Sequence, residues 1–261
     1  MTTPYICMNK DNIFFIKALG IISMILFLFS SSAAARRIPD SALGKAEYEV
    51  RYKYKLFNSK VATAVISLSK DKWEGRSAFH AKASIKASSV FRMFMGEEYV
   101  SDSYLTSSAT PLYCINPLKK DKVTGKREYY YNSKSKTIES VLAWGDETPK
   151  SKVISQDGPT MELLSLIFFT RFYDFSSGEK IKLHVLMNGR SYPATLCSEG
   201  IDNERFPGRK VERVLLEMTE RGLMEDGSGN EITMWRSTGS DRTAICLEVP
   251  LSSGLMTVMI K

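Results

Sequence analysis

Histidine and cysteine are scarce in this chain of 261 residues, which contains two histidines and four cysteines. Neither histidine has a carboxylate or a cysteine at metal-ligand spacing, so no metal site is predicted. The HExxH, GxSxG, P-loop and CxxC motifs are also absent, which excludes the common zinc-peptidase, serine-hydrolase, nucleotide-binding and dithiol classes. The sequence therefore predicts a non-enzymatic protein, without a catalytic residue, a metal or a cofactor.

Long apolar runs are also rare. The longest, "ALGIISMILFLF" from Ala18 to Phe29, is shorter than the roughly 20 residues that a transmembrane helix needs. Two lysines precede it, and "SSSAAA" follows with the small-x-small arrangement that a signal peptidase cleaves. Residues 1–35 are therefore predicted to be a signal peptide cleaved near Ala35, and the protein is predicted to be exported to the periplasm or cell envelope. The alternative is an uncleaved anchor, and Met8 is a second candidate for the start.

Cleavage would leave a mildly basic chain with three cysteines. The formal charge of +7 falls to +6, because the signal peptide carries two lysines and one aspartate. In an oxidising compartment, Cys114, Cys197 and Cys246 would supply one disulfide and one free thiol, but their spacing does not select the pair. All three lie in apolar, strand-like runs, which favours buried thiols.

Alternating polarity dominates the segment that follows. In "AEYEVRYKYKL" (46–56) the tyrosines and the valine fall on one face and the charged residues on the other, as in a half-buried antiparallel strand. "VATAVISLS" (61–69) and "SAFHAKASIKA" (77–87) follow after short turns. Three strands in a meander are therefore predicted.

Further strands follow to the end of the chain, separated by turn residues. Thr124–Gly125 and Asn188–Gly189 are predicted hairpin tips, because both pairs contain a residue that tolerates positive φ. Residues 36–261 are predicted to form one mainly-β domain, a single antiparallel and strongly curved sheet or a barrel-like sheet.

The most apolar segment after the signal peptide is "MELLSLIFFTRFYDF" (161–175), which would be apolar nearly all round a helix. Asp157 or Thr160 is predicted to cap its N-terminus. The helix would be about 22 Å long, too short to cross a bilayer, and Arg171 and Asp174 oppose a membrane span further. We interpret it as the principal helix, buried in the core against the curved sheet.

This helix and three other stretches carry a resemblance. "ELLSLIFFTRFYDFSSGEKIKLHVLMNG" combines a Leu-Ser step, an aromatic run, an arginine and an Asn-Gly hairpin tip. The others are "AEYEVRYKYKLFNSKVATAVISLS", "EYVSDSYLTSSATPLY" and "NEITMWRSTGSDRTAICLEVPLSSGLMTVMI". In this order they resemble the exported family known as domain of unknown function 3108. Ser165 and Arg171 match its pattern, whereas Glu162 stands where Asp is usual and Ala244 where Pro is often seen. The resemblance spans about residues 43–260, and it implies an envelope protein with an antiparallel, barrel-like sheet and no known activity.

Apolar side chains gather where the strand alternation fails. "VFRMFM" contains Phe91, Met93, Phe94 and Met95, and methionine-rich surfaces adapt to irregular apolar ligands. These four residues are candidates for binding an apolar ligand near an opening of the sheet. The alternative is that they close one end of a barrel.

Arg171 is the fifth candidate binding residue. In a buried helix its guanidinium needs a carboxylate or carbonyl partner, because an unpaired buried charge is costly. It would either lock the helix to the sheet or bind the anionic head group of a ligand. Ser165 is interpreted as a packing residue, since no histidine or lysine is near it in the pattern.

The densest positive charge lies at 119–136, together with Tyr129, Tyr130 and Tyr131. Strand alternation places Tyr130 opposite its two neighbours, so no continuous platform for single-stranded nucleic acid is predicted. We interpret this hairpin as a solvated rim, with contact to an anionic envelope glycan or lipid as the alternative.

These features together predict an exported, non-enzymatic binding or scaffold module. Its partner would be an apolar or lipid-like ligand or another envelope protein, with no nucleic acid and with peripheral membrane contact at most. The alternative is an envelope hydrolase with an unrecognised active site. The oligomeric state, the ligand and the pairing of the cysteines stay open.

Overall fold

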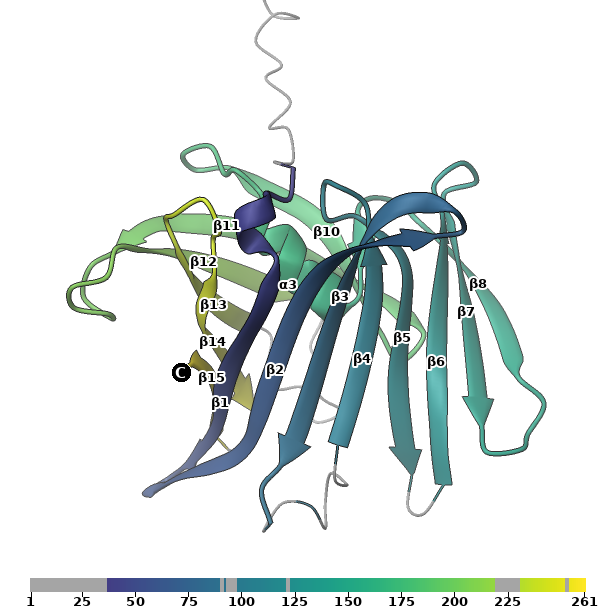
Figure 1. The fold of residues 1–261 in the computed structure, drawn as a ribbon, viewed down its shortest axis with the longest axis horizontal. Coiled ribbons are helices and arrows are strands. Elements are labelled where there is room, and N and C mark those ends of the chain that lie inside the picture. Colours follow the sequence, from purple (N-terminus) through teal and green to yellow (C-terminus); the bar gives the residue numbers. More distant parts are fainter. Residues whose placement is uncertain (1–36, 90–91, 93–97, 121–122, 219–230, 252–253) are drawn as a thin grey trace, which may run out of the picture. The chain divides into compact units, whose positions relative to one another are not determined.

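The computed structural model describes residues 37–89, 92, 98–120, 123–218, 231–251 and 254–261, and within them fifteen strands form one sheet (Figure 1). The first half of the sheet comprises β1 (Gly44–Tyr54), β2 (Phe57–Trp73), β3 (Arg76–Ala87), β4 (Glu98–Leu105), β5 (Pro111–Lys120), β6 (Val123–Asn132), β7 (Thr137–Trp144) and β8 (Lys150–Ser155). The second half comprises β9 (Thr160–Met161), β10 (Lys180–Met187), β11 (Arg190–Asp202), β12 (Val211–Met218), β13 (Glu231–Ser237), β14 (Ala244–Leu251) and β15 (Gly254–Ile260).

Strands that are neighbours in the sheet are also consecutive in the chain, except where β1 lies beside β15. The sheet runs from β8 to β1 and then from β15 to β9, because β1 pairs antiparallel with β15. The other pairs are antiparallel too, except that the two-residue β9 runs parallel to β10. The two edge strands, β8 and β9, are therefore consecutive in the chain. The prediction of a mainly-β, curved antiparallel sheet with one principal helix is confirmed.

Side-chain alternation explains the first three strands. Tyr48 and Val50 of β1 are 1% and 6% exposed, whereas Glu49 between them forms ion pairs with Arg51 and Lys60 on the other face. β2 pairs with both β1 and β3 in antiparallel register. The predicted meander is therefore confirmed.

One hairpin tip was predicted correctly and the other was wrong. Asn188 and Gly189 have φ angles of 49° and 74° and connect β10 to β11, as a type I′ turn requires. Thr124–Gly125, in contrast, lies inside β6, because Lys120 pairs with Val123 across the tip. Gly125 has a packing role instead: a Cβ there would lie 2.5 Å from the Trp144 ring and 2.6 Å from the Ala143 carbonyl oxygen.

The principal helix, α3 (Leu163–Phe172), lies inside the curve of the sheet and contacts β3, β4 and β10 (Figure 1). Eight of its ten residues are buried, so the predicted core helix is confirmed, although it is shorter than 161–175. The predicted caps were wrong. Thr160 belongs to β9, and Glu162 caps the helix by accepting hydrogen bonds from the backbone nitrogens of Leu164 and Ser165.

The remaining sequence-based predictions on export and cysteines have different outcomes. The predicted signal peptide, residues 1–35, lies outside the described residues and stays a prediction. In the part of the chain that is described, no helix combines the length and hydropathy that a membrane span needs. Cys114 and Cys246 are buried and Cys197 is half-buried, and all three are free thiols.

Candidate functional site

A buried polar cluster fixes the N-terminus of α3 to the sheet. The Glu162 side chain, 2% exposed, accepts hydrogen bonds from the hydroxyls of Ser103 on β4 at 2.6 Å and Ser165 at 2.7 Å. It also accepts from the backbone nitrogens of Leu164 at 2.7 Å and Ser165 at 2.6 Å. The carboxylate is therefore saturated with donors, as a buried charge requires.

The same cluster brings a thiol next to a hydroxyl, but its geometry is structural. Cys114 Sγ lies 3.9 Å from Ser165 Oγ, and both residues are fully buried. Burial, reinforced by the Glu162 carboxylate, raises the pKa of Cys114 well above its usual value, which keeps the thiol protonated and unreactive. Ser165 directs its hydroxyl to Glu162, so the interpretation of Ser165 as a packing residue agrees with its contacts.

At the C-terminus of α3, Arg236 of β13 binds backbone carbonyl groups at the end of the helix. Its side chain is completely buried. Nη1 donates to the carbonyl oxygens of Thr170, Arg171 and Tyr173, the acceptors that a helix end leaves without partners. Nε and Nη2 donate to Glu212 Oε2 at 3.0 and 2.7 Å. No sequence pattern predicted this role of Arg236.

Arg171 is buried, as predicted, with 7% exposure. Of the two partner types expected, the structure has carbonyls: Nε donates to Arg242 O and Nη2 to Asp241 O, both at 3.0 Å. The guanidinium also lies 5.1 and 5.0 Å from the ring centres of Phe168 and Phe172. Arg171 therefore locks the helix to the loop between β13 and β14.

Beside Arg171 lies a polar cavity of about 170 Å³, which Ser41, Ser67 and Thr243 also line. Nη1 of Arg171 makes no hydrogen bond with the described residues. Burial lowers the pKa of Arg171, although Tyr48 and Asp241 act in the opposite direction. The lining therefore contains two cationic residues, Arg171 and Lys45, and three hydroxyl-bearing residues that could bind an anion.

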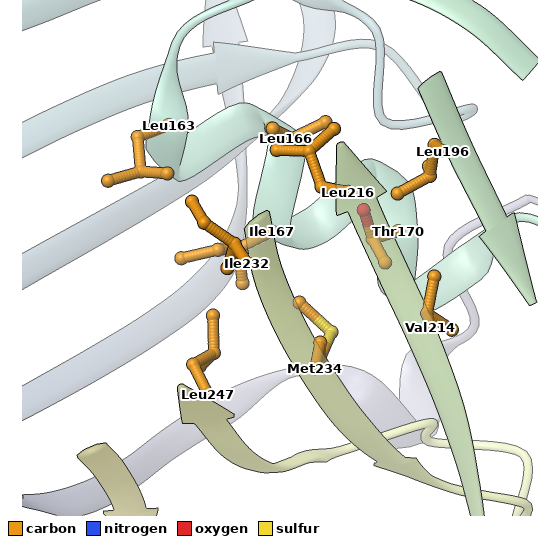
Figure 2. Close-up of a pocket in the computed structure, with 10 residues that line it drawn as sticks. All are labelled: Leu163, Leu166, Ile167, Thr170, Leu196, Val214, Leu216, Ile232, Met234 and Leu247. Atoms are coloured by element: carbon orange, nitrogen blue, oxygen red, sulfur yellow. The ribbon is translucent and has the colours of Figure 1, made fainter. Parts of the chain in front are cut away.

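An apolar groove lies along another side of α3. Leu163, Leu166, Ile167 and Thr170 recur at helical spacing and face strands of the second half of the sheet, as Figure 2 shows. The strand residues that line it are Leu196, Val214, Leu216, Ile232, Met234 and Leu247. Only about 20 Å³ of free space remains between these side chains. The groove is nevertheless accessible at its end, where Leu163 is 45% exposed.

The other four predicted binding residues, Phe91, Met93, Phe94 and Met95, lie outside the described residues. The groove itself was not predicted from the sequence. Its helical half was detectable from the i, i+3, i+4, i+7 spacing that starts at Leu163. Its strand half was not, because four different strands supply it.

Both histidines are half-buried. His80 Nε2 lies 2.8 Å from Asp102 Oδ1 on the neighbouring strand, and its ring stacks on Tyr104. His184 is half-buried, and its Nδ1 has no hydrogen-bond partner among the described residues. Those residues contain no group of three side chains suited to holding a metal ion.

Comparison with known proteins relates this architecture to others. No curated protein matches the chain. Among solved structures, it is similar to a β-barrel-like protein of domain of unknown function DUF1849 from Brucella abortus. The TM-score is 0.51 at 8% sequence identity, and the match covers 83% of this chain and 94% of that chain. At this identity the likeness shows the fold alone.

A family model matches residues 47–261 and is described as protein of unknown function, DUF3108. The match covers most of the chain and nearly all of its sheet. The resemblance carried by the motifs around α3 and in the terminal hairpins is thereby confirmed. The chain belongs to the DUF3108 family.

Proposed function

We propose that this chain is an exported, non-enzymatic binding module of the cell envelope, and that the groove beside α3 binds the acyl chain of a lipid-like ligand. The observation that carries the proposal is the apolar lining of the groove together with the exposure of Leu163 at its end. Thr170 is the only polar residue in that lining. An acyl chain covering Leu163 and Ile167 would remove apolar surface from water, which is favourable by about 25 cal/mol per Å².

The small free volume is compatible with this role. The helical side of the groove is lined by Leu163, Leu166, Ile167 and Thr170, and an acyl chain would enter by displacing the side chains at its exposed end. Export is supported by the N-terminal sequence pattern. Phe91, Met93, Phe94 and Met95 are proposed to contribute to the entrance, as their composition suggests.

The substitution Leu163→Asp tests the groove. We expect it to weaken the binding of cis-parinaric acid, a fluorescent fatty acid, by at least about tenfold, because a charged carboxylate would have to be desolvated beside the chain. The fold should persist, since Leu163 is 45% exposed and an acidic residue is favourable in the first turn of a helix. The measurement is a fluorescence titration of the purified, delipidated full chain.

Ile201→Asp is the matched control. Ile201 of β11 is an aliphatic residue with 46% exposure, and it does not line the groove. Its substitution should leave the affinity for cis-parinaric acid unchanged. Equal effects of the two substitutions, or no saturable uptake by the wild-type chain at micromolar probe, would refute the proposal and leave a scaffold role.

For Arg171 we propose the second role considered from the sequence, contact with the anionic end of the ligand. The free Nη1 and the polar cavity support it. We expect palmitic acid at pH 8 to displace cis-parinaric acid at least about tenfold more effectively than hexadecanol, because only the acid offers a carboxylate for a charge-assisted hydrogen bond. Equal displacement by the acid and the alcohol would assign Arg171 a structural role alone.

A further inference from the structure

A third cavity, with a lining distinct from those of the α3 groove and of the polar cavity beside Arg171, opens beside hairpins in the first half of the sheet. It measures about 500 Å³, within the range of roughly 300–1,000 Å³ that is usual for small-molecule sites. Trp73 and Arg76 line it from the β2–β3 hairpin, Tyr130 from β6 and Glu139 from β7. We call this cavity the aromatic cleft.

The Trp73 and Tyr130 rings of the cleft both pack against the ring of Tyr113. Trp73 stacks on Tyr113, with 4.3 Å between ring centres and 11° between planes. Tyr113 also contacts Tyr130 at 5.0 Å, its cross-strand neighbour. Tyr113 itself is 8% exposed, and its hydroxyl donates to Glu128 Oε1 at 2.6 Å. A fixed, buried ring therefore supports Trp73 and Tyr130, so little order is lost when a ligand stacks on them.

Around these rings the cleft is polar but carries no net charge. Its charged residues are Glu74, Arg76, Lys134 and Glu139, two acids and two bases. The side chains of Glu74 and Arg76 make no hydrogen bond or ion pair with the described residues, although both are exposed at the cleft. Planar carboxylate and guanidinium groups each offer adjacent atoms for two hydrogen bonds. Such a rim suits a ligand with neighbouring hydroxyl groups and no charge.

We propose that the aromatic cleft binds a neutral saccharide. A sugar ring has an apolar C–H face that can lie on Trp73 or Tyr130, and a rim of hydroxyls that Arg76 and Glu139 can bind. An acyl chain does not fit, because it would bury the charged rim without compensating hydrogen bonds. An added peptide strand does not fit either. The adjoining edge strand is β8, which carries Lys150 and Lys152, and lysines on an edge strand oppose pairing with another strand.

The test uses isothermal titration calorimetry of the full chain with chitotetraose, cellotetraose and maltotetraose. We expect at least one of them to bind saturably at millimolar or lower concentration. Tyr130→Ala should weaken that binding about tenfold, since one stacking contact is lost. The affinity should be unchanged in 0.5 M sodium chloride, roughly the regime in which surface charge attraction is screened. Trp73→Ala should remove binding, with circular dichroism as the check of its fold.

Tyr54→Ala is the matched control. Tyr54 on β1 is 39% exposed and Tyr130 is 37% exposed, but Tyr54 does not line the cleft. Its loss should not change the affinity for the saccharide. The proposal is overturned if none of the three saccharides binds, if Tyr130→Ala and Tyr54→Ala have equal effects, or if an uncharged peptide displaces the saccharide with similar affinity. These outcomes do not depend on fatty-acid binding at α3.

Discussion

Replacing Arg236 with methionine is expected to destabilise the protein by about 3–5 kcal/mol. Methionine fills a similar volume but donates no hydrogen bond. The Glu212 carboxylate, 17% exposed, would lose both of its close contacts to Arg236. Three carbonyl oxygens at the end of α3 would lose their shared donor. The free energy of unfolding, measured by urea denaturation at pH 7, gives the loss directly.

Arg213→Met is the control for this substitution. Arg213 lies on β12 beside Glu212, and it pairs with Glu199 at 2.8 Å, with both side chains 39% exposed. An exposed pair of this kind contributes only about 0–1 kcal/mol. The double variant Arg236→Met with Glu212→Gln should recover part of the loss, because the charge that lost its nearest cationic partner is then removed. A loss below about 1 kcal/mol for Arg236→Met would contradict a structural role for this pair.

Glu162→Ala is expected to cost about 3 kcal/mol, the second largest effect, because it removes a helix cap and a buried hydrogen-bond acceptor together. Ser103 and Ser165 would keep buried hydroxyls without their carboxylate partner. The first turn of α3 would lose two acceptors for its backbone nitrogens. Urea denaturation monitored by circular dichroism measures the loss.

Glu162→Asp separates the two contributions. Aspartate is a good helix cap, but it is one methylene shorter and would lose the reach to Ser103 on β4. We expect it to cost about 1 kcal/mol, the typical value for one hydrogen bond. If Glu162→Asp were as damaging as Glu162→Ala, the bond to Ser103, and not the cap, would carry the effect.

Local patterns in the residue order were sufficient for much of the fold. The alternation around Tyr48 and Val50 identifies a half-buried strand, because successive strand side chains point to opposite faces. Asn188–Gly189 identifies its hairpin because positive φ is a property of the two residues themselves. The apolar residues on nearly all faces of α3 identify a buried helix, because their spacing along the chain is enough to show it. Burial of Arg171 follows from its place on that helix.

Features that depend on partners far along the chain could not be derived in this way. Glu162 was not recognised as the cap, since its side chain is held by Ser103, 59 residues away. Thr124–Gly125 looks like a turn, but the register with β5 and β7 places it inside a strand. Pairing register is set by the whole sheet and not by the two residues at a tip.

The candidate sites show the same division most clearly. Along its own strand, Tyr130 points to the face opposite its two tyrosine neighbours, which predicts no continuous aromatic surface. Across the sheet, it meets Tyr113 and, through that ring, Trp73. The groove beside α3 likewise joins helix residues to four strands that follow later in the chain. Residue order specifies the face on which each side chain lies within its strand or helix. Strand pairing and the packing of α3 against the sheet bring those faces together, because contacts between distant segments form only when the chain folds.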